Sequence, residues 1–348
     1  MTTVDVNASV KYKVVIGEEL LCDCGNITAQ AILPCKAAVI SDSNVFPLYG
    51  EKVKTSLENA GFSTVQYVFP AGEKSKNLNT YSDIIEFLAR QKLSRTDIII
   101  ALGGGVVGDM AGFCAATYLR GIRFVQIPTT ILSACDSSVG GKTAVDISTG
   151  KNLVGAFHQP SLVICDTDTF ETLPSREVSC GLSEIIKYGV ICDKELFEEL
   201  ASGDYDIQSI ITRCVEIKRD IVEKDEKETG ERKLLNLGHT LGHAVEKHSG
   251  FTLSHGEAVA VGMMMISEIS EKLGYGEKIT ERLKTVLEKY SLPCAYDITK
   301  KEMFDISCGD KKVDGKDITL VIPREIGKCI LEKVTLEKFS DMLSMILE

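Results

Sequence analysis

In the first half of the chain, short runs rich in apolar and β-branched residues alternate with longer amphipathic runs. The strand-like runs cover residues 37–41, 64–69, 97–102, 124–128 and 162–166, and the helix-like runs cover 48–60 and 80–91. Alternation of this kind is typical of βαβ units, which form a parallel sheet covered by helices. The first half is therefore predicted to be an α/β domain.

The pattern changes near the sequence Leu173-Pro174-Ser175, after which amphipathic helical patterns dominate. Pro174 suits a helix start and Ser175 suits a helix cap. We predict two domains, because single cores stop growing at roughly 250 residues. The expected division is an α/β domain over residues 1–174 and an all-α domain over 175–348. One late apolar run, 318–323, could be a strand within the helical half.

Composition narrows the class of protein. Of the 348 residues, 44% are hydrophobic and 26% are charged, and the formal net charge is −11. Such a surface repels nucleic acids and anionic membranes, so neither is expected as a partner. No signal-like segment begins the chain, and its most apolar stretch, 258–266, is too short to span a bilayer. We expect a cytoplasmic protein whose 12 scattered cysteines are reduced.

A glycine motif follows the predicted strand 97–102. Gly103, Gly105 and Gly108 satisfy GxGxxG, a pattern whose backbone amides and helix N-terminus can hold a dinucleotide pyrophosphate. The same glycines also fit a plain strand-to-helix turn. No acidic residue ends the next strand, as an ordinary Rossmann domain requires. Asp42, after the first strand, could bind a ribose instead, or could simply be a turn residue.

The segment 129–151 is dense in small, hydroxyl-bearing and charged residues, which indicates a binding surface. Its Gly-Gly-Lys-Thr sequence is not a P-loop, because Asp136 occupies the position of the first P-loop glycine. A nucleoside triphosphatase is therefore excluded. Lys142 and Lys151 could converge on a phosphate or carboxylate, or could be ordinary surface lysines.

Four of the five histidines lie between residues 239 and 255. His239 and His243 are four apart on a predicted helix and so share a face, and Asn236, three residues earlier, lies next to that face. Thr240 stands where the HExxH motif of zinc proteases carries its catalytic glutamate. A zinc protease is therefore excluded.

A complete metal-ligand set can be assembled around this helix. His255 opens the next predicted helix, and Glu184 interrupts an otherwise apolar helix face. Two histidines and one glutamate with an open position form a catalytic zinc site. Each histidine alone could be a core or surface residue, but the set of His239, His255 and Glu184 predicts a metal.

At several long motifs the chain resembles the 3-dehydroquinate synthases of the sugar phosphate cyclase superfamily. The matching segments are GGGVVGDMAGF (103–113), YLRGI (118–122), PTT (128–130), DSSVGGKTAVD (136–146), GKNLVGAFHQP (150–160), LPSREVSCGLSEIIKYG (173–189), LNLGHTLGHAVE (235–246) and LSHGEAVAVGM (253–263). They occur in the family's order and extend over nearly the whole chain.

The resemblance implies a Rossmann-like nucleotide-binding domain followed by a metal- and substrate-binding domain. It also implies a shikimate-pathway activity: conversion of 3-deoxy-D-arabino-heptulosonate 7-phosphate to 3-dehydroquinate and phosphate. In this family NAD transiently oxidises an alcohol, phosphate leaves by β-elimination, and reduction, ring opening and an internal aldol reaction follow. The implied class is a carbocycle-forming phosphorus–oxygen lyase with NAD and a divalent metal, zinc or alternatively cobalt.

The resemblance assigns roles to individual residues. The metal ligands are Glu184, His239 and His255. The residues of the catalytic group are His243, Lys142, Glu184, Asn236 and Lys187. The substrate-binding residues are Arg120, Asp136, Lys142, Lys151, Asn152, Lys187, Lys218, Arg232, Asn236 and Lys312, with Lys311 as an alternative to Lys312. The NAD contacts are Asp42, Asn44, Glu73, Lys76, Gly104, Gly105, Val106, Val107, Gly108, Asp109, Thr129, Thr130, Lys142, Lys151, Thr169, Phe170 and Thr172. A homodimer is implied, with Arg120 reaching the substrate phosphate of the neighbouring subunit.

Three alternatives share some of these features. A 2-deoxy-scyllo-inosose synthase has the same fold and cofactors, but its sugar phosphate carries no carboxylate for Arg232 and Asn236 to bind. A glycerol-dehydrogenase-like oxidoreductase would not require so many lysines. A non-catalytic sensor of metal and dinucleotide would bind both without turnover.

Overall fold

The computed structural model describes residues 1–309, 313–314 and 317–348 and divides the chain into two units. The first unit comprises Met1–Leu173 and Ile207–Lys227, and the second comprises Pro174–Asp206 and Glu228–Glu348. The expected boundary, between residues 174 and 175, lies one residue after the point where the chain first passes from the first unit to the second. Helix α7 (Ile207–Lys224), however, groups with the first unit, because it packs on strand β1 (Thr2–Asn7) and the turn η4 (Ser133–Ser137). Its amphipathic pattern predicts a helix without indicating the unit on which the helix packs.

A seven-stranded sheet forms the centre of the first unit, in the order β1-β2-β9-β6-β5-β3-β4. Its strands are β1 (Thr2–Asn7), β2 (Lys11–Gly17), β3 (Lys36–Asp42), β4 (Ser63–Phe69), β5 (Ile98–Gly103), β6 (Arg123–Pro128) and β9 (Leu162–Asp166). All neighbours are parallel except β1, which is antiparallel to β2. The parallel sheet and its five predicted strands are confirmed. Strand β5 is buried along its whole length, which explains its continuous apolar sequence.

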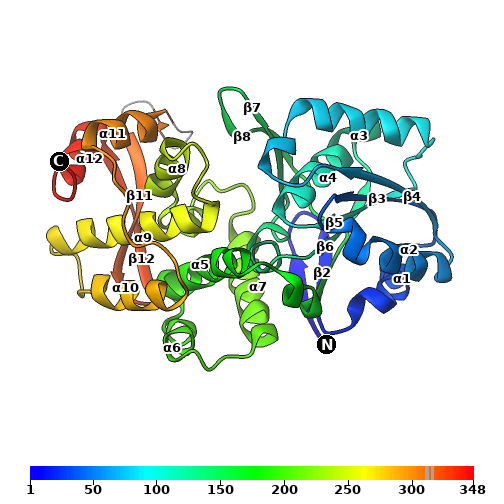
Figure 1. Cartoon of the computed structure of the whole chain (residues 1–348), viewed down its shortest axis with the longest axis horizontal. Coiled ribbons are helices and arrows are strands. Elements are labelled where there is room, and N and C mark those ends of the chain that lie inside the picture. The colour runs from blue at the N-terminus through cyan, green and yellow to red at the C-terminus, as the bar shows by residue number, and fades with distance from the viewer. Residues whose placement is uncertain (310–312, 315–316) are drawn as a thin grey trace. The chain divides into compact units, whose positions relative to one another are not determined.

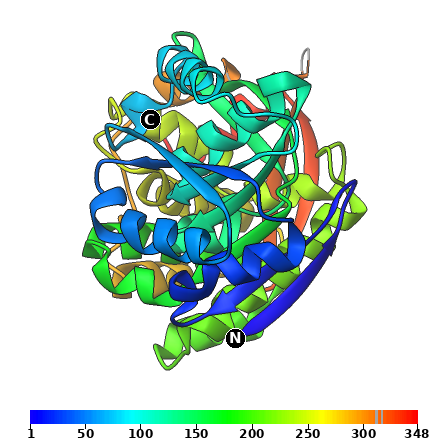
Figure 2. The same cartoon turned by 90° about the vertical axis from the view of Figure 1, so that its right-hand side faces the viewer.

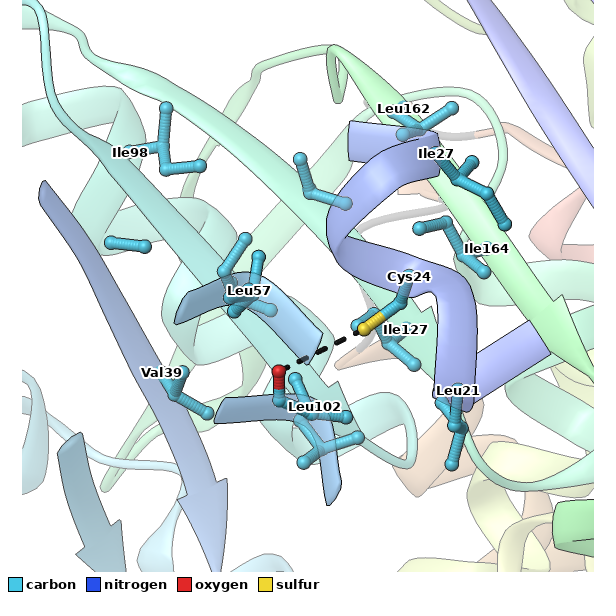
Figure 3. Packing of buried hydrophobic residues seen from close by; sticks show 14 of the residues in the cluster. Leu21, Cys24, Ile27, Val39, Leu57, Ile98, Leu102, Ile127, Leu162 and Ile164 are labelled. Carbon is cyan, nitrogen blue, oxygen red and sulfur yellow. Dashed lines mark hydrogen bonds between the residues drawn. The ribbon is translucent and has the colours of Figure 1, made fainter. Parts of the chain in front are cut away.

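Helices cover both faces of this sheet (Figure 1). Helices α1 (Leu20–Ala31) and α2 (Glu51–Asn59) pack on one face, and α3 (Leu78–Arg90) and α4 (Gly105–Thr117) pack on the other. Figure 3 shows the first of these cores, where Cys24 of α1 lies among Leu57 and apolar strand residues and donates from Sγ to the Val53 carbonyl. A Cβ on Gly25 would lie 2.0 Å from the Ser56 carbonyl oxygen, so glycine is what allows α1 and α2 to approach so closely.

Two hairpins complete the first unit, and neither is among the elements predicted from the sequence. The hairpin β1–β2 is bound to the end of α7, where Asn7 donates from N to Glu223 at 2.6 Å. Just after this helix, Glu226 accepts from N and Oγ of Ser9 at 3.0 and 2.6 Å. Figure 2 shows this dark-blue hairpin beside the light-green helix. The second hairpin, β7 (Lys142–Ile147) with β8 (Gly150–Phe157), packs on α4. The predicted binding segment 129–151 is therefore partly a hairpin.

The second unit is built around α9 (His255–Lys272), which packs on α5, α8, α10 and strand β11. The other helices are α5 (Ser175–Cys192), α6 (Lys194–Ser202), α8 (His239–His248), α10 (Thr280–Lys289), α11 (Lys300–Cys308) and α12 (Leu336–Leu343). The prediction of a helical second half is confirmed. Strands β10 (Val313–Asp314), β11 (Asp317–Glu325) and β12 (Lys328–Thr335) add a small antiparallel sheet. The apolar run 318–323 is thus a strand, and the second half is not all-α.

Short helical turns carry several of the candidate residues. They are η1 (Phe46–Gly50), η2 (Glu73–Ser75), η3 (Tyr118–Arg120), η4 (Ser133–Ser137), η5 (Thr167–Thr172) and η6 (Glu231–Asn236). Across the described part of the chain, no helix combines the length and apolarity that a membrane crossing requires.

Candidate active site

Three helices of the second unit bring the predicted metal ligands together. Glu184 lies in the middle of α5, His239 is the first residue of α8, and His255 is the first residue of α9. Glu184 Oε1 lies 3.8 Å from His239 Nε2 and 3.5 Å from His255 Nε2. One donor atom from each residue lies within 4.8 Å of the others. This donor set fits Zn²⁺ or Co²⁺, although metal binding itself stays a prediction.

Glycines fix the helices that carry these ligands. A Cβ on Gly256 would lie 2.5 Å from the Cα of Cys180, so the start of α9 rests directly on the backbone of α5. Gly238 has φ +74 immediately before α8, and a Cβ there would lie 2.8 Å from the Val259 carbonyl oxygen. Larger residues at either position would move His239 or His255 away from Glu184.

Side chains reinforce the start of α9. Ser254 and Glu257 form a capping box, which satisfies backbone amides at the helix N-terminus. Arg176 of α5 donates from Nε to Glu257 at 2.8 Å and from Nη2 to the same carboxylate and to the Thr252 carbonyl. His255 therefore begins a helix that is tied to the helix of Glu184.

The two histidine ligands differ in their electrostatics. Burial, assisted by the charge of Lys187, places the pKa of His239 well below its usual value, so its imidazole is neutral. Its Nδ1 lies 3.0 Å from the Leu237 carbonyl oxygen, which assigns the N–H to Nδ1 and the lone pair to Nε2. Burial also opposes a charged His255, but the carboxylates of Glu184 and Glu246 together raise the pKa of His255 to about 9.

Two other predicted residues, Lys187 and His243, lie beside this cluster. Lys187 of α5 is buried and donates to Glu184 Oε2. The ring of His243 lies 5.5 Å from that of His239 and 5.7 Å from that of His255, between centroids. Arg232 in η6 is also buried. The structure thus places Lys187 against the ligand set and His243 one helical turn after His239.

The placement of Asn236 differs from the expectation. It ends η6 and is not part of the helix of His239, because the positive φ of Gly238 interrupts the backbone between them. Its Nδ2 donates to Glu228 Oε1 at 2.5 Å. Sequence reasoning did not single out Glu228, or Glu246, whose Oε2 lies 3.6 Å from His255 Nδ1. Only the spacing of Glu246, three residues after His243, could have indicated it.

In the first unit, most of the predicted NAD contacts follow the carboxyl ends of parallel strands. Strands β3 and β5 are neighbours, although β4 lies between them in the sequence, so the order of the sheet reverses at this point. Ligands of open α/β sheets bind at such a switch point. The predicted contacts are Asp42 at the end of β3 and Asn44 after it, Glu73 and Lys76 after β4, Gly104 to Asp109 after β5, Thr129 and Thr130 after β6, and Thr169, Phe170 and Thr172 after β9. They therefore share one edge of the sheet.

The glycine motif combines two physical roles. A Cβ on Gly108 would lie 2.7 Å from Gln126 Oε1, so this glycine serves helix–strand packing. A Cβ on Gly105, the first residue of α4, would meet nothing closer than 3.4 Å. The buried Thr129 hydroxyl has no hydrogen-bond partner among the described residues. A helix N-terminus open at Gly105 and a buried hydroxyl after the next strand fit a dinucleotide diphosphate.

Asp42 acts as a turn residue in the structure. Its Oδ1 accepts from the amides of Asn44 and Val45 at 2.8 and 3.0 Å. This was one of the two roles expected for it. Ribose binding by the same carboxylate stays a prediction.

A buried lysine connects two groups of predicted residues. Lys76 Nζ donates to Asp109 Oδ2 at 2.5 Å and to Asn152 Oδ1 at 2.6 Å. Burial opposes the charge on Lys76, but Asp109 and Glu73 raise its pKa, so the ammonium persists. Lys151 lies 3.1 Å from Glu73 in the same region. The hairpin β7–β8 is thus attached through Asn152 and Lys151 to residues that follow β4, and Lys76 connects it to Asp109 after β5.

Two further pairs of predicted residues differ in how close their members lie, Lys218 with Asp136 and Lys142 with Lys151. Lys218 of α7 lies 3.0 Å from Asp136 Oδ1 and donates to the Asp136 carbonyl at 2.6 Å. Lys142, by contrast, is paired with Phe157 at the base of the hairpin, whereas Lys151 lies next to its turn. This separation is roughly 15–20 Å along the strands. The first pair is brought together, whereas the binding of one anion by both Lys142 and Lys151 stays a prediction.

The turn that carries Arg120 has an unusual backbone. Leu119 and Arg120 have φ values of +51 and +69, a left-handed conformation that is unfavourable for residues with a Cβ. Lys312, the remaining substrate-binding candidate, and its alternative Lys311 lie outside the described residues.

Comparison with solved structures identifies the class to which this fold and site belong, the sugar phosphate cyclases. The chain matches a crystal structure of 2-deoxy-scyllo-inosose synthase complexed with carbaglucose-6-phosphate, NAD⁺ and Co²⁺ with a TM-score of 0.86 and 26% identity, covering 98% of this chain and 99% of that one. It also matches ValA, the 2-epi-5-epi-valiolone synthase of Streptomyces hygroscopicus subsp. jinggangensis 5008, with NAD⁺ and Zn²⁺ bound, with a TM-score of 0.88, 26% identity and 98% coverage of both chains.

Sequence comparison gives the particular family. Residues 66–180 match the model of the 3-dehydroquinate synthase N-terminal domain, and residues 181–313 match that of the C-terminal domain. The 3-dehydroquinate synthase of Clostridium acetobutylicum is 46% identical, with 93% of each chain covered. That of Nostoc punctiforme is 44% identical, covering 97% of this chain and 96% of the relative. The chain belongs to the 3-dehydroquinate synthase family.

Proposed function

We propose that this protein is a 3-dehydroquinate synthase, which converts 3-deoxy-D-arabino-heptulosonate 7-phosphate to 3-dehydroquinate and phosphate in the shikimate pathway. The observation that carries the proposal is the His239, His255 and Glu184 cluster in a chain related to these enzymes over almost its full length. The reaction class is a phosphorus–oxygen lyase that forms a carbocycle. The residues and relatives support the use of NAD and a divalent metal, zinc or cobalt.

Each bound group would supply a distinct chemistry. A divalent metal held by Glu184, His239 and His255 would acidify an alcohol, and NAD would accept and return a hydride. Lys187 forms a buried ion pair with Glu184 and so keeps this carboxylate in place. His239 offers a neutral Nε2 because its pKa is lowered. His243 is the residue to which we assign proton handling.

The charged side chains of the predicted site suit an anionic substrate. We assign its phosphate and hydroxyl groups to Lys142, Lys151, Asn152, Lys218 and Asp136, and its carboxylate to Arg232 and Asn236. The pairing of Asp136 with Lys218 and of Asn152 with Lys76 keeps these polar groups oriented before substrate binds. A substrate with both a phosphate and a carboxylate explains why an acidic protein carries so many cations here.

The activity can be tested directly with the purified protein. The heptulosonate phosphate, NAD and Zn²⁺ are supplied, and phosphate release and carbocyclic product are followed by NMR. We expect stoichiometric phosphate release without accumulation of NADH. Glucose 6-phosphate serves as the control substrate. Turnover of glucose 6-phosphate alone, or no phosphate release from the metal-loaded protein, would contradict the proposal.

We also propose a homodimer in which Arg120 serves the neighbouring subunit. The strained turn at Leu119 and Arg120 supports a functional role, because such backbone strain is concentrated at functional sites. Mixing inactive Arg120→Ala and Lys142→Ala proteins should restore part of the activity if one mixed site contains both native residues. Failure of a mixed dimer, verified by mass, to recover activity would refute the shared site.

We place the protein in the cytoplasm. All 12 cysteines are free thiols in the structure, as a reducing compartment favours. Fractionation of cells with an antibody against the chain would test this placement.

A further inference from the structure

Each ring nitrogen of His255 faces a different carboxylate. Nε2 lies 3.5 Å from Glu184 Oε1, and Nδ1 lies 3.6 Å from Glu246 Oε2. Glu246 is only 5% exposed and lies on α8, the helix that begins with His239. Carboxylates are seldom buried without a role in binding a positive or hydrogen-bonding group. The role of Glu246 is therefore to be sought at His255.

We propose that Glu246 is a positioning residue for the metal site, holding the N–H of His255 on Nδ1 so that the Nε2 lone pair points to the ion. The inference rests on the metal site of the proposed function. His239 has the same arrangement, since its Nδ1 lies 3.0 Å from the Leu237 carbonyl oxygen while its Nε2 faces Glu184. Both histidine ligands thus have an oxygen at Nδ1. Oxygen acceptors behind metal-bound histidines fix the tautomer and increase ligand basicity.

A second metal ion is the competing interpretation, because His243, Glu246 and His255 also have donor atoms within 4.8 Å of one another. With both sites filled, His255 would have to supply a lone pair from each ring nitrogen. A neutral imidazole has only one such lone pair, the other nitrogen being an N–H donor. Glu246 as an acceptor requires no such deprotonation. The positioning role is therefore favoured.

The carboxylate also contributes to the charge balance of the site. A divalent ion would lie close to the buried ammonium of Lys187, and Glu184 alone supplies one negative charge against these three positive charges. The second carboxylate, Glu246, reduces the remaining positive charge from two to one. Because charges interact strongly where water is excluded, this compensation should favour ion binding.

Two substitutions separate the roles of Glu246. Glu246→Gln retains size and a hydrogen-bond acceptor but removes the charge, whereas Glu246→Leu removes the acceptor as well. Glu302→Gln is the matched control, because Glu302 Oε1 also lies 3.6 Å from a histidine nitrogen, His248 Nε2, but at an exposed position. Glutamine at position 302 can still form the capping box with Thr299 at the start of α11.

The test measures Zn²⁺ affinity and stoichiometry of chelator-stripped full-length protein by competition with a chromophoric chelator. We expect one ion per chain throughout, a loss of affinity of about 10–100-fold in Glu246→Leu, a smaller loss in Glu246→Gln and none in Glu302→Gln. Cobalt-loaded protein should show a changed visible spectrum only in the Glu246 variants. Circular dichroism checks that each variant is folded. If Glu246→Leu does not fold, the Zn²⁺ affinity and cobalt spectrum of Glu246→Gln test the proposal.

The outcomes distinguish this inference from the proposed function. Wild-type affinity in the folded Glu246 variants would overturn the positioning role and leave the metal site intact. Two ions in the wild type and one in the variants would make Glu246 a ligand of a second ion. No Zn²⁺ binding by the wild type would overturn the metal site itself, and the inference with it.

Discussion

Lys76 and Asp109 form an ion pair of 2.5 Å between residues 33 positions apart in the chain, and both side chains are largely buried. The same ammonium binds the side chain of Asn152 in the β7–β8 hairpin. A residue expected to contact the cofactor is thus bonded directly to one expected to contact substrate.

Breaking this pair should destabilise the first unit. Lys76→Met leaves the buried Asp109 carboxylate without its cation, which should cost about 3–5 kcal/mol of unfolding free energy. The double variant Lys76→Met/Asp109→Asn should recover much of that loss, since no uncompensated charge is left. Urea unfolding of the single and double variants measures the coupling. Additive losses would mean that the pair is not coupled.

The carboxyl group of Asp97 should make the free energy of unfolding depend on pH in the acidic range. Burial works against its charge, but the Ser94 amide at 2.6 Å and the Lys36 amide at 3.0 Å bind the carboxylate, and the pKa of Asp97 is lowered. Its contribution is therefore fully present above the unfolded pKa of about 4 and is lost as the pH falls through the lower folded value. Asp97→Asn should be less stable than the wild type at pH 6, and the difference should shrink near pH 3. A difference independent of pH would contradict this assignment.

Gly105 and Gly112 of α4 should respond differently to alanine. Gly105→Ala meets no close atom and should preserve stability while weakening NAD binding, because a methyl group would occupy the open helix N-terminus. Gly112→Ala would place Cβ 2.4 Å from Thr143 Cγ2 and should cost about 1–3 kcal/mol. NAD titration and thermal unfolding measure the two effects. Unchanged NAD affinity in Gly105→Ala would remove this glycine from the cofactor site.

The Arg176 and Glu257 pair should influence the metal site through the start of α9. Arg176→Lys replaces a two-pronged contact by a single charge, and we expect up to about fivefold weaker Zn²⁺ binding, which corresponds to the roughly 1 kcal/mol that an exposed pair can contribute. Arg282→Lys is the control, because Arg282 makes a similar contact with Glu198 between α6 and α10. Equal effects of the two substitutions would rule out a specific influence on His255.

The sequence predicted the buried parts of the fold better than the half-exposed parts. Strands β3, β5, β6 and β9 have continuous apolar sequences because both faces of the sheet are covered. Strand β8 has mainly exposed or half-exposed residues and contains glycines, so its sequence lacks that signal. The hairpins therefore became evident only in the structure.

The sequence predicted those site residues whose types are rare in the chain or unusual in their surroundings. Four clustered histidines and one carboxylate on an apolar helix face were sufficient to select Glu184, His239 and His255. Glu228 and Glu246 are two of 50 acidic residues, and only three-dimensional contacts separate them from the rest. Asn236 was placed on the wrong element because helical spacing does not reveal the positive φ of Gly238.

The return of residues 207–227 to the first unit has a consequence for synthesis on the ribosome. Residues 1–173 leave the ribosome before α7 exists, so their sheet is formed without the segment 207–227, which accepts hydrogen bonds from Asn7 and Ser9 at the edge of the sheet. The nascent first unit must therefore wait for about 50 further residues, at a few seconds of translation, before its last layer can dock. A gene fragment that ends at the expected boundary would encode an open intermediate rather than a finished domain.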